Sequence, residues 1–138
     1  MKTILLSLSF SLTILLVPQL RADLADLKQA RLKRGIVLVA GKISLNVAEQ
    51  VMALGKDTEF TIYFQSPDAA QVLAVRRASD KAGLLGERVF VEQSGLDRIC
   101  LGDNMVDLAI VRGVKEKELL RVLRPGAEAI SADKKITK

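Results

Sequence analysis

The stretch IVLVAGKISLNVAEQVMALG, residues 36–55, decides the fold class. Its first part, residues 36–40, is a continuous apolar run, too short for a helix and rich in β-branched residues, which predicts a strand buried on both faces. Apolar residues then recur at helical spacing, with Ser44 as a candidate N-cap and Gly55 as a stop signal. A buried strand that turns through a glycine into an amphipathic helix is typical of a parallel α/β sheet.

The same strand-and-helix unit recurs towards the C-terminus. Further apolar runs predict strands at residues 60–64, 88–92 and 106–111. Helical patterns predict helices at residues 24–34, 69–82 and 116–123, and Pro125-Gly126 marks the end of the last. This alternation predicts a three-layer, mostly parallel, Rossmann-like α/β sheet with strand order 3-2-1-4 and at most a fifth strand at residues 128–131.

The first 22 residues have the layout of a secretory signal peptide. Lys2 precedes an uncharged run at residues 4–17, Pro18 breaks the helix, and Ala22 offers a cleavage point. As a helix the run spans about 21 Å, short of a hydrocarbon core of roughly 30 Å. We therefore expect a signal peptide at 1–22, an α/β domain at 23–131, a frayed polar tail at 132–138, and export to the periplasm or medium; the alternative is an uncleaved membrane anchor.

The composition excludes several function classes. The chain has no histidine and one cysteine, Cys100, which argues against a zinc site, a histidine-based triad and an internal disulfide. Loss of residues 1–22 removes Lys2 and Arg21 but no acid, so the net charge falls from +5 to +3. That charge is too low to indicate a nucleic-acid partner. We expect no metal and no stable membrane span once the signal peptide is removed.

Two motifs in the second half carry a family resemblance. DNMVDL, residues 103–108, fits an acidic turn before a strand, and LRVLRPG, residues 120–126, fits the helix end L-x-R-V-L-[KR]-P-G-G with Ala127 in place of the last glycine. With these motifs, residues 36–131 resemble the class I S-adenosylmethionine-dependent methyltransferases of type 11, and also the variant found in exported bacterial proteins beside quinoprotein-like modules. Alternatively, LRVLRPG is only a helix with a Pro-Gly stop.

The front half departs from the cofactor motif that this resemblance implies. In the family, S-adenosylmethionine lies at the carboxyl ends of the strands, around a first turn of the pattern acid-x-G-x-G-x-G. Here only Gly41 is present, because Val39 stands in place of the acid. Ile43 and Leu45 stand in place of the second and third glycines. A β-branched residue resists positive φ, so we expect a turn with a different path and a degraded site.

The ribose-binding acid of the family, which follows the second strand, also lacks a direct counterpart. Gln65 and Ser66 offer hydrogen bonds without a charge, while Asp68 comes late and is either a ribose ligand or a helix N-terminal acid. These losses total roughly 3 to 5 kcal/mol, which turns a micromolar site into about a millimolar one. An active methyltransferase predicts that Gly41→Trp removes ligand binding and leaves the fold intact.

The loop after the third strand holds the remaining candidates. The resemblance places the adenine contact near Glu92 or Asp97, of which Asp97 is the better candidate; a solvated loop acid is the alternative. Cys100 is interpreted as a small, partly buried filler. The candidate cofactor residues are therefore Gly41, Ser66, Asp68 and Asp97, and no catalytic residue is identified. Lys42, near the helix N-terminus at Ser44, is a weaker candidate for binding an anion.

The leading hypothesis is an exported methyltransferase-like domain, active through methyl transfer from S-adenosylmethionine if at all. The rival hypothesis is a non-catalytic interaction module that docks a protein partner at an open sheet edge. The resemblance implies seven strands, whereas the pattern supplies four or five. Three explanations remain open: a truncated gene product, pairing with a partner, or a minimal fold capped by its N-terminal helix.

Overall fold

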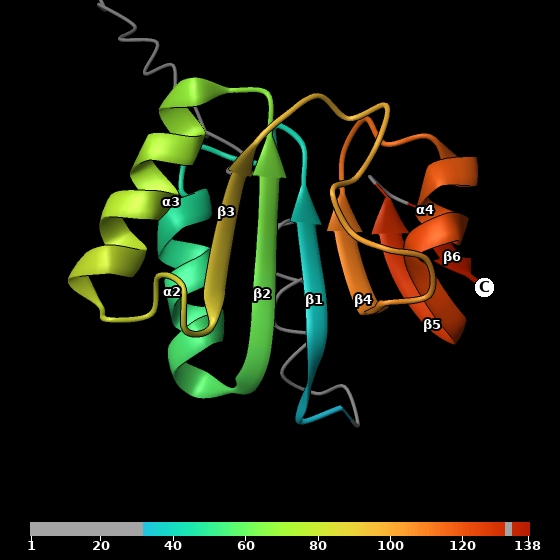
Figure 1. Cartoon of the computed structure of the whole chain (residues 1–138), viewed down its shortest axis with the longest axis horizontal. Helices are drawn as coiled ribbons and strands as arrows, with labels where there is room; N and C mark the ends of the chain where they lie inside the picture. Colours follow the sequence, from blue (N-terminus) through green and yellow to red (C-terminus); the bar gives the residue numbers. More distant parts are fainter. Residues whose placement is uncertain (1–31, 132–133) are drawn as a thin grey trace, which may run out of the picture.

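A computed structural model of the chain describes residues 32–131 and 134–138. The expected signal peptide at 1–22 and nearly all of the helix expected at 24–34 lie outside the described residues. The described part forms one six-stranded sheet between helices (Figure 1). Within it, no helix is both long enough and apolar enough to span a membrane.

The elements alternate as the pattern predicts. The strands are β1 Arg34–Ala40, β2 Glu59–Ser66, β3 Val89–Gln93, β4 Val106–Val111, β5 Leu123–Ser131 and β6 Lys134–Thr137. The helices are α2 Val47–Asp57, α3 Ala69–Lys81 and α4 Glu116–Val122. The sheet order is β3-β2-β1-β4-β5-β6, parallel from β1 to β5, with β6 antiparallel to β5. The α/β class and the order 3-2-1-4 are confirmed.

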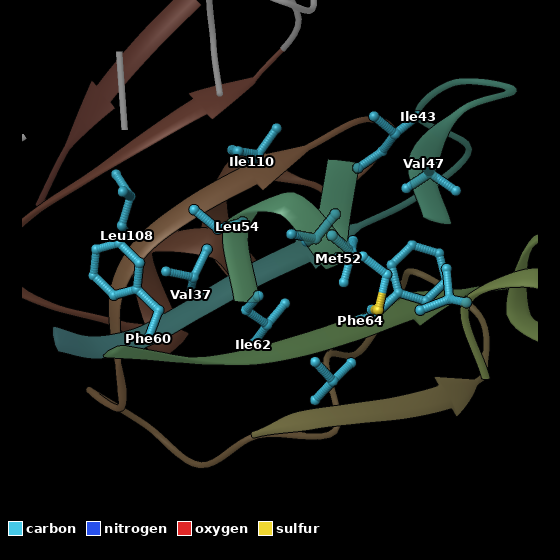
Figure 2. Packing of buried hydrophobic residues seen from close by; sticks show 14 of the residues in the cluster. Val37, Ile43, Val47, Met52, Leu54, Phe60, Ile62, Phe64, Leu108 and Ile110 are labelled. Carbon is cyan, nitrogen blue, oxygen red and sulfur yellow. The ribbon is translucent and has the colours of Figure 1, made fainter. Parts of the chain in front are cut away.

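Each face of the sheet carries a buried layer. On one face, side chains of β1, β2 and β4 pack against α2 and α3; Figure 2 shows this cluster, including Val37, Phe60, Ile62, Phe64 and Leu108. On the other face, alternate residues of the same strands pack against α4 and residues of the loop after β3, including Leu38, Ala109, Ile99 and Leu119. A strand buried on both faces explains why residues 36–40 carry no polar alternation.

The C-terminal part differs from the prediction. Pro125-Gly126 was expected to end a helix, but α4 ends at Val122 and the two residues lie inside β5. The β4–β5 pairing shifts register there, from Val106 opposite Leu123 to Leu108 opposite Glu128. A bulge of this kind accepts proline because the ladder is interrupted.

The polar tail predicted at residues 132–138 is wrong for residues 134–137, which form β6. Ile136 pairs with Ala129 and is buried in the α4-side layer, so one apolar side chain anchors the strand. Hydrogen bonds from Gly126 N to Lys138 O (2.9 Å) and from Lys138 N to Ala127 O (3.1 Å) extend the pairing. A segment with a single apolar residue has no periodicity to reveal this, because the neighbouring strand decides it.

Helix α2 begins and ends at different residues from those expected. Ser44 does not cap it; Asn46 precedes Val47, and it makes no side-chain capping bond. Leu45 is fully exposed rather than part of the apolar face. Gly55 lies inside α2, where an added Cβ would come 3.1 Å from a Leu84 methyl group, so close packing rather than helix termination accounts for this glycine.

Residues 94–105 connect β3 to β4 without a helix. This segment, here called the crossover, leaves the carboxyl end of β3, passes over the carboxyl ends of β2 and β1, and descends beside α4 to the start of β4 (Figure 1). In a parallel sheet the carboxyl ends of the strands form the usual ligand edge, at the point where the strand order reverses. The crossover therefore runs across the place where a ligand is expected.

Candidate functional site

The β1–α2 turn at the reversal between β1 and β4 is built around Gly41. Gly41 N donates a hydrogen bond to Gln65 O (2.9 Å), and Arg112 N donates to Ala40 O (2.9 Å). Gly41 has φ +106°, and an added Cβ would lie 2.0 Å from Arg112 O. The backbone thus requires glycine here whether or not a ligand binds. The expectation that Gly41→Trp leaves the fold intact is wrong.

The rest of this turn is directed towards the core. Ile43, in place of the second glycine of the family pattern, is buried among the residues that pack against α2. Leu45, in place of the third, points into solvent. Between Lys42 and Asn46 no residue has positive φ, so Ile43 fits without strain.

Ser66 and Asp68 lie together at the carboxyl end of β2, and both serve the start of α3. Ser66 is fully buried, and its hydroxyl accepts a hydrogen bond from Asp68 N (3.2 Å). Asp68 is the N-cap of α3, since its Oδ1 accepts from Ala70 N (2.9 Å) and Gln71 N (3.4 Å). The structure places both candidates beside Gly41, with their polar atoms engaged in capping.

Gln65, which the sequence pattern did not mark as a central residue, is buried at the end of β2. It is fully buried (0% exposed), and its Nε2 donates to Gly95 O (2.7 Å) and Arg98 O (3.0 Å). Its Oε1 accepts from Cys100 N (2.9 Å). Every polar group of the amide is thus satisfied by the crossover backbone. A glutamine directly after the run Ile62-Tyr63-Phe64 of a buried strand was the available signal for a buried hydrogen-bonding role.

Asp97 is not brought to this cluster. Its side chain is 93% exposed and lies 3.3 Å from Lys115, just before α4. This position fits the alternative of a solvated loop acid. The Lys42 ammonium group lies 3.8 Å from the Asp68 carboxylate. An anion bound to Lys42 would therefore also meet this carboxylate.

Tyr63 and Cys100 meet on the crossover side of the sheet. Burial, together with a smaller effect of the neighbouring Cys100 and Glu92, raises the pKa of the Tyr63 hydroxyl to about 12. A hydroxyl with this pKa remains protonated at neutral pH and is a poor general base. Among the described residues, no group of three or more His, Cys, Asp or Glu side chains forms a potential metal site.

The two motifs that carry the resemblance contact each other. Asn104 N donates to Arg121 O (2.9 Å) and Met105 N to Val122 O (2.8 Å). Arg124 lies 3.1 Å from Asp107, whose other oxygen accepts from Ile36 N (2.8 Å). DNMVDL and LRVLRPG thus hold the amino end of β4 to the end of α4, on the opposite edge from Gly41.

Arg121 is the centre of this contact. Its guanidinium donates to Glu118, to Asp103 Oδ1 (2.7 Å), and to the carbonyl oxygens of Leu101 (3.0 Å) and Ile99 (2.9 Å). The pairing with Glu118 holds the pKa of Arg121 above its ordinary range. The bond from Arg121 likewise lowers the pKa of the Glu118 carboxyl, against a smaller opposing effect of burial.

Two open hollows of about 540 Å³ each lie at the amino edge of the sheet. Both are lined by Leu32, Asp107 and Arg124, and neither includes Gly41, Ser66, Asp68 or Asp97. They are therefore separate from the edge where the fold places a nucleotide.

The residues at the carboxyl edge do not fit S-adenosylmethionine as the family binds it. β2 ends without a carboxylate for the ribose, and the Gln65 amide and the Ser66 hydroxyl are already bonded. The Gly41 N–H is committed to Gln65 O, and the crossover passes over the same edge (Figure 1).

No family model matches the chain, and no curated protein matches it in sequence. Solved structures do match. One is an S-adenosylmethionine-dependent methyltransferase from Aquifex aeolicus, with TM-score 0.62 and 26% identity over 78% of this chain and 61% of that one. Another is geranyl diphosphate C-methyltransferase from Streptomyces coelicolor A3(2), with TM-score 0.64 and 12% identity over 80% of this chain and 45% of that one.

The [4+2]-cyclase SpnF matches equally well, with TM-score 0.65 and 20% identity over 82% of this chain and 43% of that one. The chain thus spans between 43% and 61% of the lengths of these three proteins. It has a class I methyltransferase-like fold. Because a protein named as a cyclase shares this fold, the fold alone does not define the activity.

Proposed function

We propose that the chain is an exported methyltransferase-like domain whose S-adenosylmethionine site is degraded. The main observation behind this proposal is that polar groups at the ligand edge are hydrogen-bonded within the chain. The Gln65 side chain, the Ser66 hydroxyl and the Gly41 N–H all bond to neighbouring parts of the protein. The fold supports S-adenosylmethionine as the ancestral ligand. The local geometry supports weak binding, with an affinity about a thousandfold below a micromolar site.

The first test is a two-dimensional amide NMR titration of the purified chain with millimolar S-adenosylhomocysteine. We expect dispersed signals that barely shift at Gly41, Asp68 or Asp97 below about 0.1 mM and are far from saturation at about 1 mM, given the lost charged contact. Saturable shifts at these residues in the micromolar range would refute the degraded site. As a control, the same S-adenosylhomocysteine stock is titrated into an authentic class I methyltransferase, which should bind it.

Export is tested separately. The N-terminal pattern supports a signal peptide at 1–22, so we expect these residues to be absent from the chain recovered from the periplasm of a bacterial host. Intact-mass spectrometry of the recovered chain measures this loss. A chain that stays in the membrane fraction with Met1 to Ala22 attached would support the anchored alternative instead.

The second candidate is a non-catalytic interaction module. One observation favours it: β3 forms one edge of the sheet, and Phe90 in that strand is 39% exposed. An edge strand with an exposed aromatic side chain is suited to pairing with another strand. If β3 pairs with a second copy, sedimentation velocity shows a concentration-dependent dimer that Phe90→Glu abolishes; a monomer at all concentrations excludes self-pairing.

A further inference from the structure

Gln65 lies where the sheet, the crossover and the ligand edge meet. It is the penultimate residue of β2, and it pairs with Ala40 on one side and Glu92 on the other. Its side chain is fully buried and makes three hydrogen bonds to crossover backbone, at Gly95 O, Arg98 O and Cys100 N. One side chain therefore fixes residues 95–100 against the carboxyl end of β2.

The same segment is held further along the edge. A Leu96 methyl group lies 3.4 Å from where a Cβ of Gly113 would be, in the turn after β4. Ile99 is buried, and its N–H donates to Glu118 Oε1 (2.7 Å) on α4. The crossover is thus anchored at β2, at the turn after β4 and on α4, and it spans the point where the strand order reverses (Figure 1).

The backbone groups around this position call for a side chain that both donates and accepts hydrogen bonds. Two carbonyl oxygens need a donor and one N–H needs an acceptor, and the glutamine side chain supplies both. A carboxylate of the same size would face Gly95 O and Arg98 O with no proton to donate, and its burial without a donor is unfavourable. A carboxylate here and a closed crossover are therefore mutually exclusive at neutral pH.

We propose that Gln65 determines ligand access: its amide closes the crossover over the ligand edge and excludes a nucleoside there. The inference rests on the proposed function, because it identifies the residue that keeps the S-adenosylmethionine site degraded. In place of an acid that would accept ribose hydroxyls, β2 carries an amide that binds the chain's own loop.

The test compares Gln65→Glu with Gln93→Glu, which makes the same chemical change at an exposed residue of β3. Loop closure is measured by hydrogen exchange at Cys100 N–H and by the rate of tryptic cleavage after Arg98, both on the purified chain. In Gln65→Glu we expect both rates to rise about tenfold or more at pH 7.5, because the loop loses its donor. Gln93→Glu is expected to match the wild type.

Access is measured by titration with S-adenosylhomocysteine, for which we expect Gln65→Glu to bind at least about tenfold tighter than the wild type. Unchanged exchange and cleavage would overturn the closing role of Gln65. An opened crossover without a gain in binding would overturn its role in excluding the nucleoside. If Gln65→Glu does not fold, Gln65→Met removes the two donated bonds, and the bond accepted from Cys100 N–H as well, without adding charge. The rate of tryptic cleavage after Arg98 is then the measurement of loop closure.

The two proposals fail differently. Micromolar binding by the wild type refutes the degraded site, even when the crossover measurements show that Gln65 holds the loop. A wild type that does not bind, combined with a crossover indifferent to Gln65, refutes the access role and leaves the degraded site standing.

Discussion

Removal of the Arg121 guanidinium is expected to be the most destabilising change at the contact between the two resemblance motifs. Arg121→Met keeps most of the aliphatic stem and removes the bonds to Glu118, Asp103, Leu101 O and Ile99 O. The Arg121 and Glu118 side chains are 19% and 12% exposed, so the Glu118 charge loses its partner in a poorly hydrated place.

The magnitude follows from these contacts. Breaking a buried pair costs about 3 to 5 kcal/mol, and an exposed pair less than about 1 kcal/mol. Asp103 is mostly exposed and adds little, whereas Glu118 and the two carbonyl oxygens are shielded. We therefore expect Arg121→Met to lower the free energy of unfolding by about 3 kcal/mol, the lower end of the buried range.

The assay is urea unfolding followed by far-ultraviolet circular dichroism, because the chain contains no tryptophan. With a slope of about 1 to 3 kcal/mol per molar urea, the midpoint falls by roughly 1 to 3 M. Arg121→Lys keeps the charge but not the planar fork and should lose about half as much. Arg124→Met removes a half-exposed guanidinium and leaves Asp107 bonded to Ile36 N, so it should cost less, about 1 kcal/mol. The reasoning is refuted if Arg121→Met costs no more than Arg124→Met.

Three further predictions concern single residues. Gly41→Ala should cost about 3 kcal/mol or more, since its Cβ meets Arg112 O, whereas Gly83→Ala, with positive φ but open space, should cost about 1 kcal/mol; equal losses in urea unfolding would contradict the steric argument. Asp68→Ala should lose about 1 kcal/mol and Asp68→Asn almost nothing, as for an N-cap, and a large loss in Asn would indicate a charge-dependent role instead. The Glu118 pKa is lowered from 4.5, so the stabilisation from this carboxylate is present above pH 4.5 and is lost as the pH falls through the lowered pKa. Glu118→Gln should therefore make the free energy of unfolding depend less on pH in the acid range. An unchanged pH dependence would exclude Glu118 as its source.

The strand-and-helix order was predictable because each element carries its own local period. Residues 36–40 are apolar without alternation, and that pattern holds in any fold that buries both faces of the strand. Val72 and Val75, three residues apart, are both buried on α3, as expected of an amphipathic helix packed on a sheet. The ends of the elements were less predictable, since Gly55 lies inside α2 and β5 begins at Leu123, before Pro125-Gly126, where a β-bulge accommodates the proline.

The position of the candidate site could be predicted from the sequence, but the hydrogen-bond partners of its residues could not. Gly41, Ser66 and Asp68 do lie together at the carboxyl edge, because neighbouring parallel strands end there. The sequence allowed two roles for Asp68, a ribose ligand or a helix N-terminal acid. The second role was visible in the sequence because a helix N-terminus is a local feature. The partners of Gln65, at Gly95, Arg98 and Cys100, had no signal in the local pattern.

By itself the sequence determined the α/β class, the order of the elements and the departure from the glycine-rich turn, because hydrophobic period and allowed φ values depend on a few neighbouring residues. Tertiary structure alone decided that Gly41 is required by Arg112, that β6 forms, that DNMVDL binds LRVLRPG, and that Gln65 holds the crossover. The physical reason is that hydrogen bonds and close contacts depend on distance in space. A side chain and a backbone group 30 or 35 residues apart in the chain, such as Gln65 and its partners at Gly95 and Cys100, become neighbours only when the sheet and the crossover have folded.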